Sequence, residues 1–297
     1  MSPKFGPLKL LLLPLTLLLL ALTACGGETL PVLKVGGIPD QDTALLARRY
    51  QIFADYLANE LEVEVEYVPS ADYAAVVTAF GQDELQLAFF GGLTGVQARL
   101  QNPGSVAIVQ RDIDAEFNSK FISRADLELS SLEDLEAQAG DLTITFGSES
   151  STSGHLMPRY YLTEAGIDAD TDFRSAPGYS GSHDTTWQQV QAGSFDIGVL
   201  AEDVWERAVN EGKADPTMVK EFWTTPDYLD YHWLVRPNVD AVYGEGFTNK
   251  IQAALLALNP QEHADILELF STEMFIETDN QNYQAIEDVG RGLGMIQ

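Results

Sequence analysis

Four hydroxyl side chains stand in a row within the stretch FGSESSTSGHLMP at residues 146–158. They are Ser150, Ser151, Thr152 and Ser153, and Gly154 follows them directly. Apolar residues predict a strand at 142–147 and a helix from about Ser153 to Gly166, so the hydroxyls mark a helix start. Unpaired N–H groups at a helix start bind anions, and hydroxyls add donors that rotate to fit. The stretch indicates an oxyanion site; the alternative is that Ser153 only caps the helix.

A second stretch of this kind, GYSGSHD at residues 178–184, follows another predicted strand. Ser182 can cap the next helix, and His183 can donate a hydrogen bond, carrying charge only where its pKa is raised. Ligands of open α/β sheets bind beyond the carboxyl ends of strands, so both stretches are candidates for one site. The alternative is a capping serine beside a surface histidine.

Other predicted strand ends add polar candidates. Gln41 follows the first strand, Thr94 follows the pair Gly91-Gly92, and Glu202 and Asp203 end a later strand. The aromatic stretch WTTPDYLDYHW at 223–233 is expected to face a cleft.

Two kinds of chemistry are not expected. Ser182, His183 and Asp184 are consecutive and point in different directions, so they cannot form a catalytic triad, and no intact G-x-S-x-G elbow is present. The four histidines show no zinc spacing. We expect no enzyme, no metal and no cofactor.

Short apolar runs alternate with helical stretches along the chain, which predicts parallel α/β sheets covered on both faces. The predicted strands are 32–39, 62–69, 85–92, 105–111, 142–147, 173–181 and 195–203, and the predicted helices between them include 44–61, 72–84, 93–101, 183–193 and 204–212. The tail after residue 244 is predicted to be helical and to return to the first block.

Two extended crossings, near 116–124 and 222–236, divide the chain into two α/β blocks. The first lobe is expected to comprise 30–118 and 235–297, and the second lobe 119–234. A hinge between two lobes follows from this plan.

The charge balance excludes nucleic acid as a partner. Seventeen Lys and Arg residues against 45 Asp and Glu give a formal net charge of −28. Phosphate contacts need basic clusters, and no run of Lys or Arg exists.

The first residues form a secretory signal pattern. Lys4 and Lys9 precede an apolar run from Leu10 to Thr23, which is too short to span a bilayer. The sequence LTAC then places the single cysteine, Cys25, where a lipoprotein signal is cut and the cysteine lipidated. We expect a signal peptide at 1–24, a lipid anchor on Cys25, a monomer, and a location outside the cytoplasmic membrane; the alternative is a plain signal peptide with a chance cysteine.

The chain resembles the phosphate, phosphite and phosphonate periplasmic binding family of ABC importers. The stretches that carry the resemblance are DYAAVVTAF with LAFFGG, GSESSTSGHLMP, GYSGSHDTTWQQVQAGSFDIG and WTTPDYLDYHWLV, in this order, and they span most of 32–297. GIPDQ, FFGGLTGVQARL and QRDIDAEF resemble a branch labelled selenate-binding. The resemblance implies a type II binding fold with mixed sheets and a two-stranded hinge, which closes on an oxyanion and delivers it to a permease.

The resemblance also implies roles for individual residues. Ser151, Thr152 and Ser153 match the oxyanion loop of the family, and Ser182 and His183 match its second anion loop. Glu202, Asp230 and Tyr73 match its cleft residues. The chain departs from the family at Phe89-Phe90-Gly91-Gly92, where Tyr or Trp often precedes Gly. A polar contact is therefore expected either to be missing there or to be replaced by Thr94.

A carboxylate beside the anion bears on which oxyanion binds. A carboxylate accepts hydrogen bonds and offers none, so it favours a ligand that still carries a proton. The second pKa of phosphoryl groups lies near 6, whereas selenate is fully ionised at neutral pH. If Asp230 faces the anion, phosphite or phosphonate is favoured; if Asp230 and Glu202 point away, selenate remains open.

Overall fold

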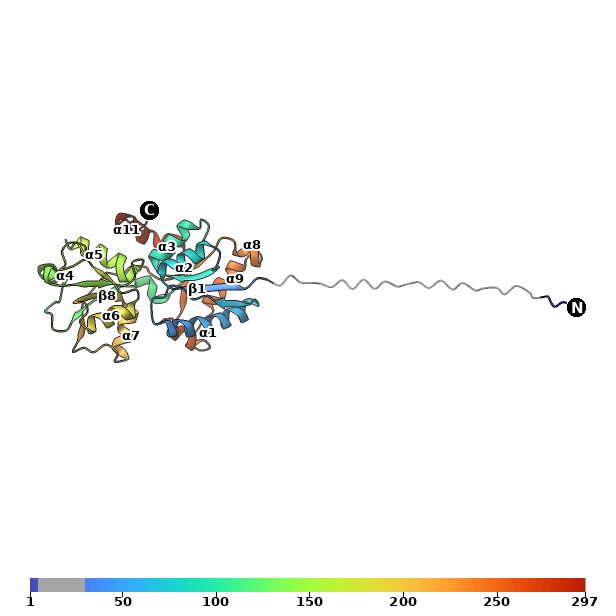
Figure 1. The fold of residues 1–297 in the computed structure, drawn as a ribbon, viewed down its shortest axis with the longest axis horizontal. Helices are drawn as coiled ribbons and strands as arrows, with labels where there is room; N and C mark the ends of the chain where they lie inside the picture. Colours follow the sequence, from blue (N-terminus) through green and yellow to red (C-terminus); the bar gives the residue numbers. More distant parts are fainter. Residues whose placement is uncertain (5–29, 297) are drawn as a thin grey trace.

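The computed structural model describes residues 1–4 and 30–296. Most of the predicted signal peptide, and Cys25 with its predicted lipid anchor, lie outside these residues. Within the described ranges, no helix is both long enough and apolar enough to cross a bilayer. The chain forms two lobes that lie side by side, each built around one sheet (Figure 1).

The first lobe contains a six-stranded sheet in the order β11-β4-β10-β3-β1-β2. Strands β1, β2 and β3 pair in parallel, whereas β10 and β11 run antiparallel to their neighbours. Its strands are β1 (Leu33–Gly37), β2 (Val65–Tyr67), β3 (Leu87–Phe90), β4 (Val106–Arg111), β10 (His232–Val235) and β11 (Phe275–Glu277). Its helices are α1 (Thr43–Leu61), α2 (Tyr73–Gly81), α3 (Gly92–Gln101), α8 (Val239–Tyr243), α9 (Phe247–Leu256), α10 (Ala264–Leu269) and α11 (Gln284–Gly292).

The second lobe contains a five-stranded sheet in the order β7-β6-β8-β5-β9. Its strands are β5 (Ser119–Arg124), β6 (Ile144–Phe146), β7 (Gly178–Tyr179), β8 (Ile197–Ala201) and β9 (Val219–Thr224). Its helices are α4 (Leu132–Gln138), α5 (Met157–Glu164), α6 (His183–Gln191) and α7 (Glu202–Asn210), and the π-helical turn η3 (Thr152–Leu156) leads into α5. Strand β5 runs antiparallel to both β8 and β9, so this sheet is also mixed.

The predicted α/β class with two mixed, helix-flanked sheets is confirmed, but two details of the prediction are wrong. The sheets are not all-parallel, because the chain returns to each of them through an antiparallel strand. The extended segments near 116–124 and 222–236 are largely strands: β5 and β9 belong to the second sheet and β10 to the first. Residues 232–234, assigned above to the second lobe, therefore lie in the first sheet.

The connections between the two sheets are short. One runs from the end of β4 to β5 and contains the 3-10 turn η1 (Asp112–Glu116), and the other runs from β9 to β10. Phe117 and Tyr228 bridge the two connections in antiparallel fashion, with N···O distances of 2.9 and 2.8 Å. The C-terminal helix α11 packs against both α3 and η3, so it lies beside the junction of the lobes (Figure 1).

Aspartate and serine caps fix where the helices begin, and so which residues face the junction. Asp42 accepts hydrogen bonds from the N–H groups of Ala44 and Leu45 at the start of α1. Asp72 accepts from Ala75 N at the start of α2, and this cap sets Tyr73 as its first helical residue. A side-chain acceptor at this position satisfies donors that the helix itself cannot pair.

The first lobe is held by stacked aromatic side chains. Trp233 of β10 stacks on Phe53 of α1 with 4.6 Å between ring centroids, and it lies 5.1 Å from Phe89 of β3. Trp233 was expected in the cleft as part of the stretch 223–233, but its side chain is fully buried in this core. Tyr231, two residues earlier, also stacks on Phe89 with 5.3 Å between ring centroids, so the two side chains share one face.

Helix α3 lies close to β10 because it carries glycine at the contact. A Cβ atom built on Gly95 would lie 2.2 Å from Nε2 of His232, which is buried. Helix α3 also packs against α11. The small residue therefore sets the distance between α3 and the sheet.

We predict that Gly95→Ala lowers the free energy of unfolding by about 1–3 kcal/mol, the usual cost of overpacking a core. The control is Gly81→Ala at the end of α2, where the nearest atom to a new Cβ lies 3.7 Å away. This control is expected to be neutral or stabilising by up to about 1 kcal/mol, because alanine favours helix. Urea unfolding of both variants measures the difference, and equal stabilities would contradict the packing argument.

Candidate functional site

The hydroxyl-rich loop begins the helix that follows β6, as the sequence predicts, but its cap is a different serine. The Ser151 hydroxyl accepts a hydrogen bond from Gly154 N at 2.9 Å, so Ser151 and not Ser153 is the capping residue. Ser151, Thr152 and Ser153 are all buried. Within the described residues, the buried hydroxyl of Ser153 has no hydrogen-bond partner. It can therefore donate to a ligand.

Neighbouring side chains fix this loop from both ends. The Ser119 hydroxyl donates to the Ser153 carbonyl at 2.7 Å and itself accepts from the Tyr228 hydroxyl at 2.7 Å. His155 Nε2 accepts from Arg159 Nε at 2.9 Å, so its Nδ1–H donates to the Glu149 carbonyl at 2.7 Å. Burial lowers the pKa of His155 to about 4, which keeps the ring neutral and this tautomer fixed.

Thr152 connects the loop to the first lobe by a hydrogen bond. Its hydroxyl oxygen accepts a hydrogen bond from Leu93 N at the start of α3, at 2.9 Å. A Cβ on Gly91 would lie 3.2 Å from both Thr152 Oγ1 and Asp230 Oδ1, so glycine allows these groups to approach the backbone. The hydroxyl-rich loop therefore faces the junction of the two lobes.

Asp230 is the carboxylate at this junction. Its Oδ1 accepts a hydrogen bond from Gly92 N at 2.9 Å, while its Oδ2 is buried and has no hydrogen-bond partner. Burial raises the pKa of Asp230 to about 7, although the Gly92 N–H and the nearby hydroxyls of Thr152 and Ser153 oppose this shift. At neutral pH the carboxyl is thus poised between its two protonation states.

Tyr73 brings a third unpartnered polar atom to the junction. Its hydroxyl is buried near Ser151 without forming a hydrogen bond of good geometry. Burial raises its pKa well above the ordinary value, so the hydroxyl keeps its proton and can donate it. We call Tyr73, Thr152, Ser153 and Asp230 the junction cluster.

His183 reaches the junction from the start of α6. Its Nδ1 accepts from Ala201 N at 3.3 Å, so its Nε2–H donates to the Tyr231 hydroxyl at 3.2 Å. Burial lowers the pKa of His183, and the ring is therefore a neutral donor. Its backbone N–H donates to the Asp40 carbonyl of the first lobe at 3.0 Å.

Four other candidates have their polar groups engaged elsewhere. The Ser182 hydroxyl caps α6 through Thr185, and the Thr94 hydroxyl donates to the Gly91 carbonyl at 3.1 Å, so it does not replace a missing tyrosine hydroxyl. Gln41 accepts from Arg49 at 3.2 Å, and with Ser182 it lines a neighbouring groove of about 730 Å³. Glu202 pairs with Lys120 at 3.0 Å and lines a different groove, so it does not join the carboxyl of Asp230.

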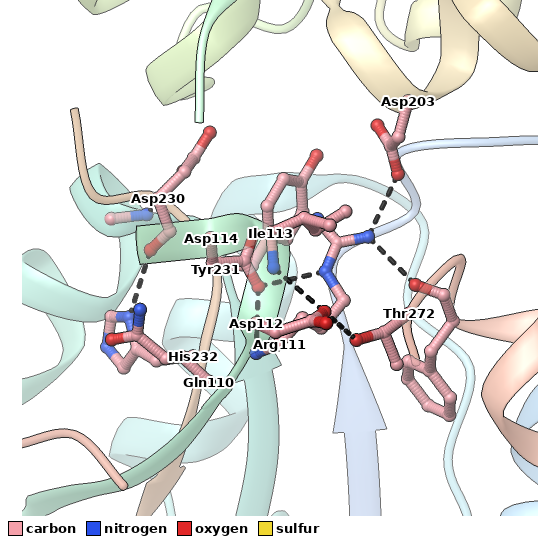
Figure 2. Close-up of polar contacts among 12 residues, drawn as sticks. Gln110, Arg111, Asp112, Ile113, Asp114, Asp203, Asp230, Tyr231, His232 and Thr272 are labelled. Carbon is pink, nitrogen blue, oxygen red and sulfur yellow. Dashed lines mark hydrogen bonds and ion pairs between the residues drawn. The ribbon is translucent and has the colours of Figure 1, made fainter. Parts of the chain in front are cut away.

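Sequence reasoning missed the charged group nearest this junction. Arg111, the last residue of β4, is buried and forms ion pairs with Asp114 and Asp203 (Figure 2). The segment QRDIDAEF signalled it, since a strand that ends in Arg followed by two acidic residues can bury a paired charge. Asp203 was considered only as a strand-end acid beside Glu202, and the structure makes it the buried one of the two.

The described residues contain no group of three or more His, Cys, Asp or Glu side chains arranged to hold a metal ion. What the junction offers is a set of neutral donors and one carboxyl of raised pKa. Such a set can hold a small oxyanion that retains a proton.

The family model for the ABC transporter phosphonate periplasmic substrate-binding protein matches residues 35–283. The chain is 43% identical over 269 residues to a probable ABC transporter phosphite binding protein, PhnD1, of Prochlorococcus marinus, covering 89% of this chain and 91% of the relative. The structure of PhnD1 from this organism in complex with methylphosphonate superposes with a TM-score of 0.86, covering 89% of this chain and 99% of the other. A binding protein component of an ABC phosphonate transporter from Pseudomonas aeruginosa, 21% identical, has a TM-score of 0.77 over 88% of this chain and 85% of its own, which shows the shared fold.

We predict that the stability difference between Asp230→Asn and the parent protein depends on pH. The folded pKa of about 7 exceeds the ordinary value of 3.8, so the native parent resists losing this proton. The contribution of Asp230 is complete below about pH 4 and is lost as pH rises towards 7, by up to about 4 kcal/mol at 1.36 kcal/mol per pKa unit. Asn has no proton to lose. The free energy of unfolding of the variant, relative to that of the parent, should therefore rise from about pH 4 to pH 7 and stay constant above pH 7.

Urea unfolding of both proteins from pH 4.5 to 8.5 measures this difference. Other titrating groups, such as Asp114, whose pKa burial raises to about 6, are present in both proteins and largely cancel. A difference that does not change with pH would show that Asp230 is ionised throughout.

Proposed function

We propose a ligand for this chain, which belongs to the ABC transporter phosphonate periplasmic substrate-binding protein family. The family consists of transport proteins and not of enzymes, and membership places the chain outside the cytoplasm with a small ligand and a permease as partners. The ligand we propose is a small tetrahedral oxyanion, phosphite or a small phosphonate, that the two lobes enclose and deliver to the permease. The relatives named for phosphite binding and solved with methylphosphonate support this class.

The observation that carries the proposal is the junction cluster. Three of its polar atoms, Tyr73 Oη, Ser153 Oγ and Asp230 Oδ2, are buried and have no hydrogen-bond partner among the residues that the structure describes. Buried polar groups are normally paired, and an unpaired one costs about 1–3 kcal/mol. Two of these atoms are donors, and the third belongs to a carboxyl that either accepts or supplies a proton. A hydrogen phosphonate or hydrogen phosphite would pair all three.

We propose that Thr152, Ser153, Tyr73, Asp230 and His183 contact the ligand. Ser151 supports this set as the cap of the loop. The resemblance or the strand ends also brought forward Ser182, Thr94, Gln41 and Glu202. We propose that these act around the site and not on the anion: the Ser182 hydroxyl caps α6, the Thr94 hydroxyl donates to the Gly91 carbonyl, and Gln41 and Glu202 line neighbouring grooves.

Asp230 also separates phosphite from selenate. An ionised carboxyl in this buried position would repel a fully ionised anion at close range, whereas a ligand proton can be shared between the two acids. Selenate carries no proton, so it could bind only to the form in which Asp230 is protonated, whereas phosphite could bind with the proton on either acid. Selenate is therefore the less favoured ligand.

Attachment to the membrane is proposed on the sequence alone. The LTAC pattern supports a lipid anchor on Cys25. Two or more acyl chains would hold the protein beside its permease.

We predict that calorimetry at pH 7 detects binding of phosphite and methylphosphonate at least tenfold tighter than sulfate or selenate, about 1.4 kcal/mol. Phosphate and aminoethylphosphonate complete the series and report how far the site tolerates a larger or more charged group. Heat from selenate alone would reverse the role given to Asp230, and no heat from any of the six anions would refute an oxyanion ligand.

We predict that Thr152→Val weakens methylphosphonate binding by more than about 1.5 kcal/mol, or more than about tenfold in Kd. Valine keeps the shape of the side chain. It removes the hydroxyl donor that would contact the ligand, and it also removes the oxygen that accepts from the Leu93 N–H. The control is Ser182→Ala, which removes a helix cap and should cost about 1 kcal/mol of stability while changing Kd by less than about threefold. Parent-like affinity in Thr152→Val would show that the loop is structural only.

A further inference from the structure

An ion pair joins the two lobes beside the junction cluster. Arg111 ends β4 of the first sheet, and Asp203 lies in the first turn of α7, which follows β8 of the second sheet. Arg111 Nη1 donates to Asp203 Oδ2 at 2.9 Å, and the side chains are only 3% and 8% exposed (Figure 2). Because its two members belong to different lobes, separation of the lobes would break this contact.

The first lobe holds the arginine in place independently of the second. Arg111 Nε and Nη2 donate to the two carboxyl oxygens of Asp114 at 2.8 Å each, a fork-to-fork pair, and Nη1 also donates to the Phe270 carbonyl at 2.9 Å. The guanidinium lies over the rings of Phe117 and Tyr231, 5.6 and 4.6 Å from their centroids. A side chain fixed in this way loses little freedom when a further partner arrives.

Asp203 is the member of the ion pair that the second lobe supplies. Its Oδ1 accepts from Val204 N at 2.9 Å, which orients the other oxygen towards Arg111. Burial acts to raise the pKa of Asp203, but the charge of Arg111 and its hydrogen bond outweigh burial, so the pKa lies below the ordinary value. The carboxylate therefore stays ionised in the closed form and keeps its attraction for the arginine.

The pair is also connected to a proposed ligand contact. The Tyr231 ring that covers Arg111 presents its hydroxyl to Nε2 of His183 at 3.2 Å. His183 Nδ1 accepts from Ala201 N, two residues before Asp203. The segment 201–203 and the tyrosine thus hold the imidazole between them, and both contact Arg111.

We infer that Arg111 and Asp203 are positioning residues for ligand capture: their ion pair stabilises the closed arrangement of the lobes and, through Tyr231, sets the orientation of His183. The inference rests on the proposed function only where ligand affinity is measured. The closing of the lobes can be followed without any ligand.

Two backbone amides report closure directly. Leu93 N–H donates to Thr152 across the lobes, and His183 N–H donates to the Asp40 carbonyl across the lobes at 3.0 Å. Opening breaks both hydrogen bonds, so hydrogen exchange at these amides measures how often the lobes separate.

The test compares Asp203→Asn with Asp196→Asn in the full chain. Asp196 is a matched control because its side chain is 9% exposed and its ion pair, with Arg124 at 3.0 Å, stays within the second lobe. In protein without added ligand, Asp203→Asn should speed exchange at Leu93 and His183 at least fivefold, whereas Asp196→Asn should not do so selectively. Methylphosphonate should bind Asp203→Asn at least tenfold more weakly, because apparent affinity falls with the closed fraction.

Asp203→Glu restores the charge and should recover at least part of both effects, which a purely structural role would not predict. Exchange at Leu93 and His183 that is unchanged in Asp203→Asn would overturn the inference. Exchange that rises equally throughout both lobes would overturn it too, since it would indicate general destabilisation. If no anion binds the parent protein, the proposed function fails, while the exchange result still decides the role of the ion pair.

Discussion

Among the described residues no cation pairs with the buried carboxyl of Asp230, and this constraint governs the chemistry of the junction. Its one hydrogen bond comes from Gly92 N at the start of α3, where the helix supplies a partial positive charge. A carboxyl in this position keeps its proton more readily than one in water, as its pKa of about 7 reflects. The site therefore contains a group whose charge changes near neutral pH, in contact with hydroxyls whose charge does not.

The two sheets bring these groups together because each lobe contributes a helix start. Strand β3 leads into α3 and strand β6 leads into η3, and Thr152 of η3 accepts from Leu93 of α3 across the lobes. Glycines at 91 and 92 allow the first lobe to present bare backbone there. In the proposed mode of binding, donors from both lobes contact the anion, so capture requires the lobes to close.

Sequence reasoning found the parts of this site that depend on local patterns. Hydroxyls before an apolar helix and a polar run after a strand predicted Ser151 to Ser153 and His183, and the structure brings Thr152, Ser153 and His183 to the junction. Strand-end patterns could not show which partners Glu202 and Gln41 have, and these side chains pair with Lys120 and Arg49. Strands β5, β9 and β10 were read as crossings because antiparallel pairing with distant strands leaves no local signal. The pairing of Arg111 with Asp203 could not be predicted from local patterns, because the two residues lie 92 positions apart.

Arg111 is a cation near a site that we describe as built from neutral donors, but its charge is already neutralised by carboxylates. Asp114 and Asp203 both pair with it, so the three groups together carry one negative charge. No net positive charge is left there to offset an anion in a chain whose formal net charge is −28. Exposed acids further than about 10 Å are largely screened, whereas this buried group is not. The compensation must then come from oriented dipoles and from a proton shared with Asp230, and this requirement selects ligands that carry one.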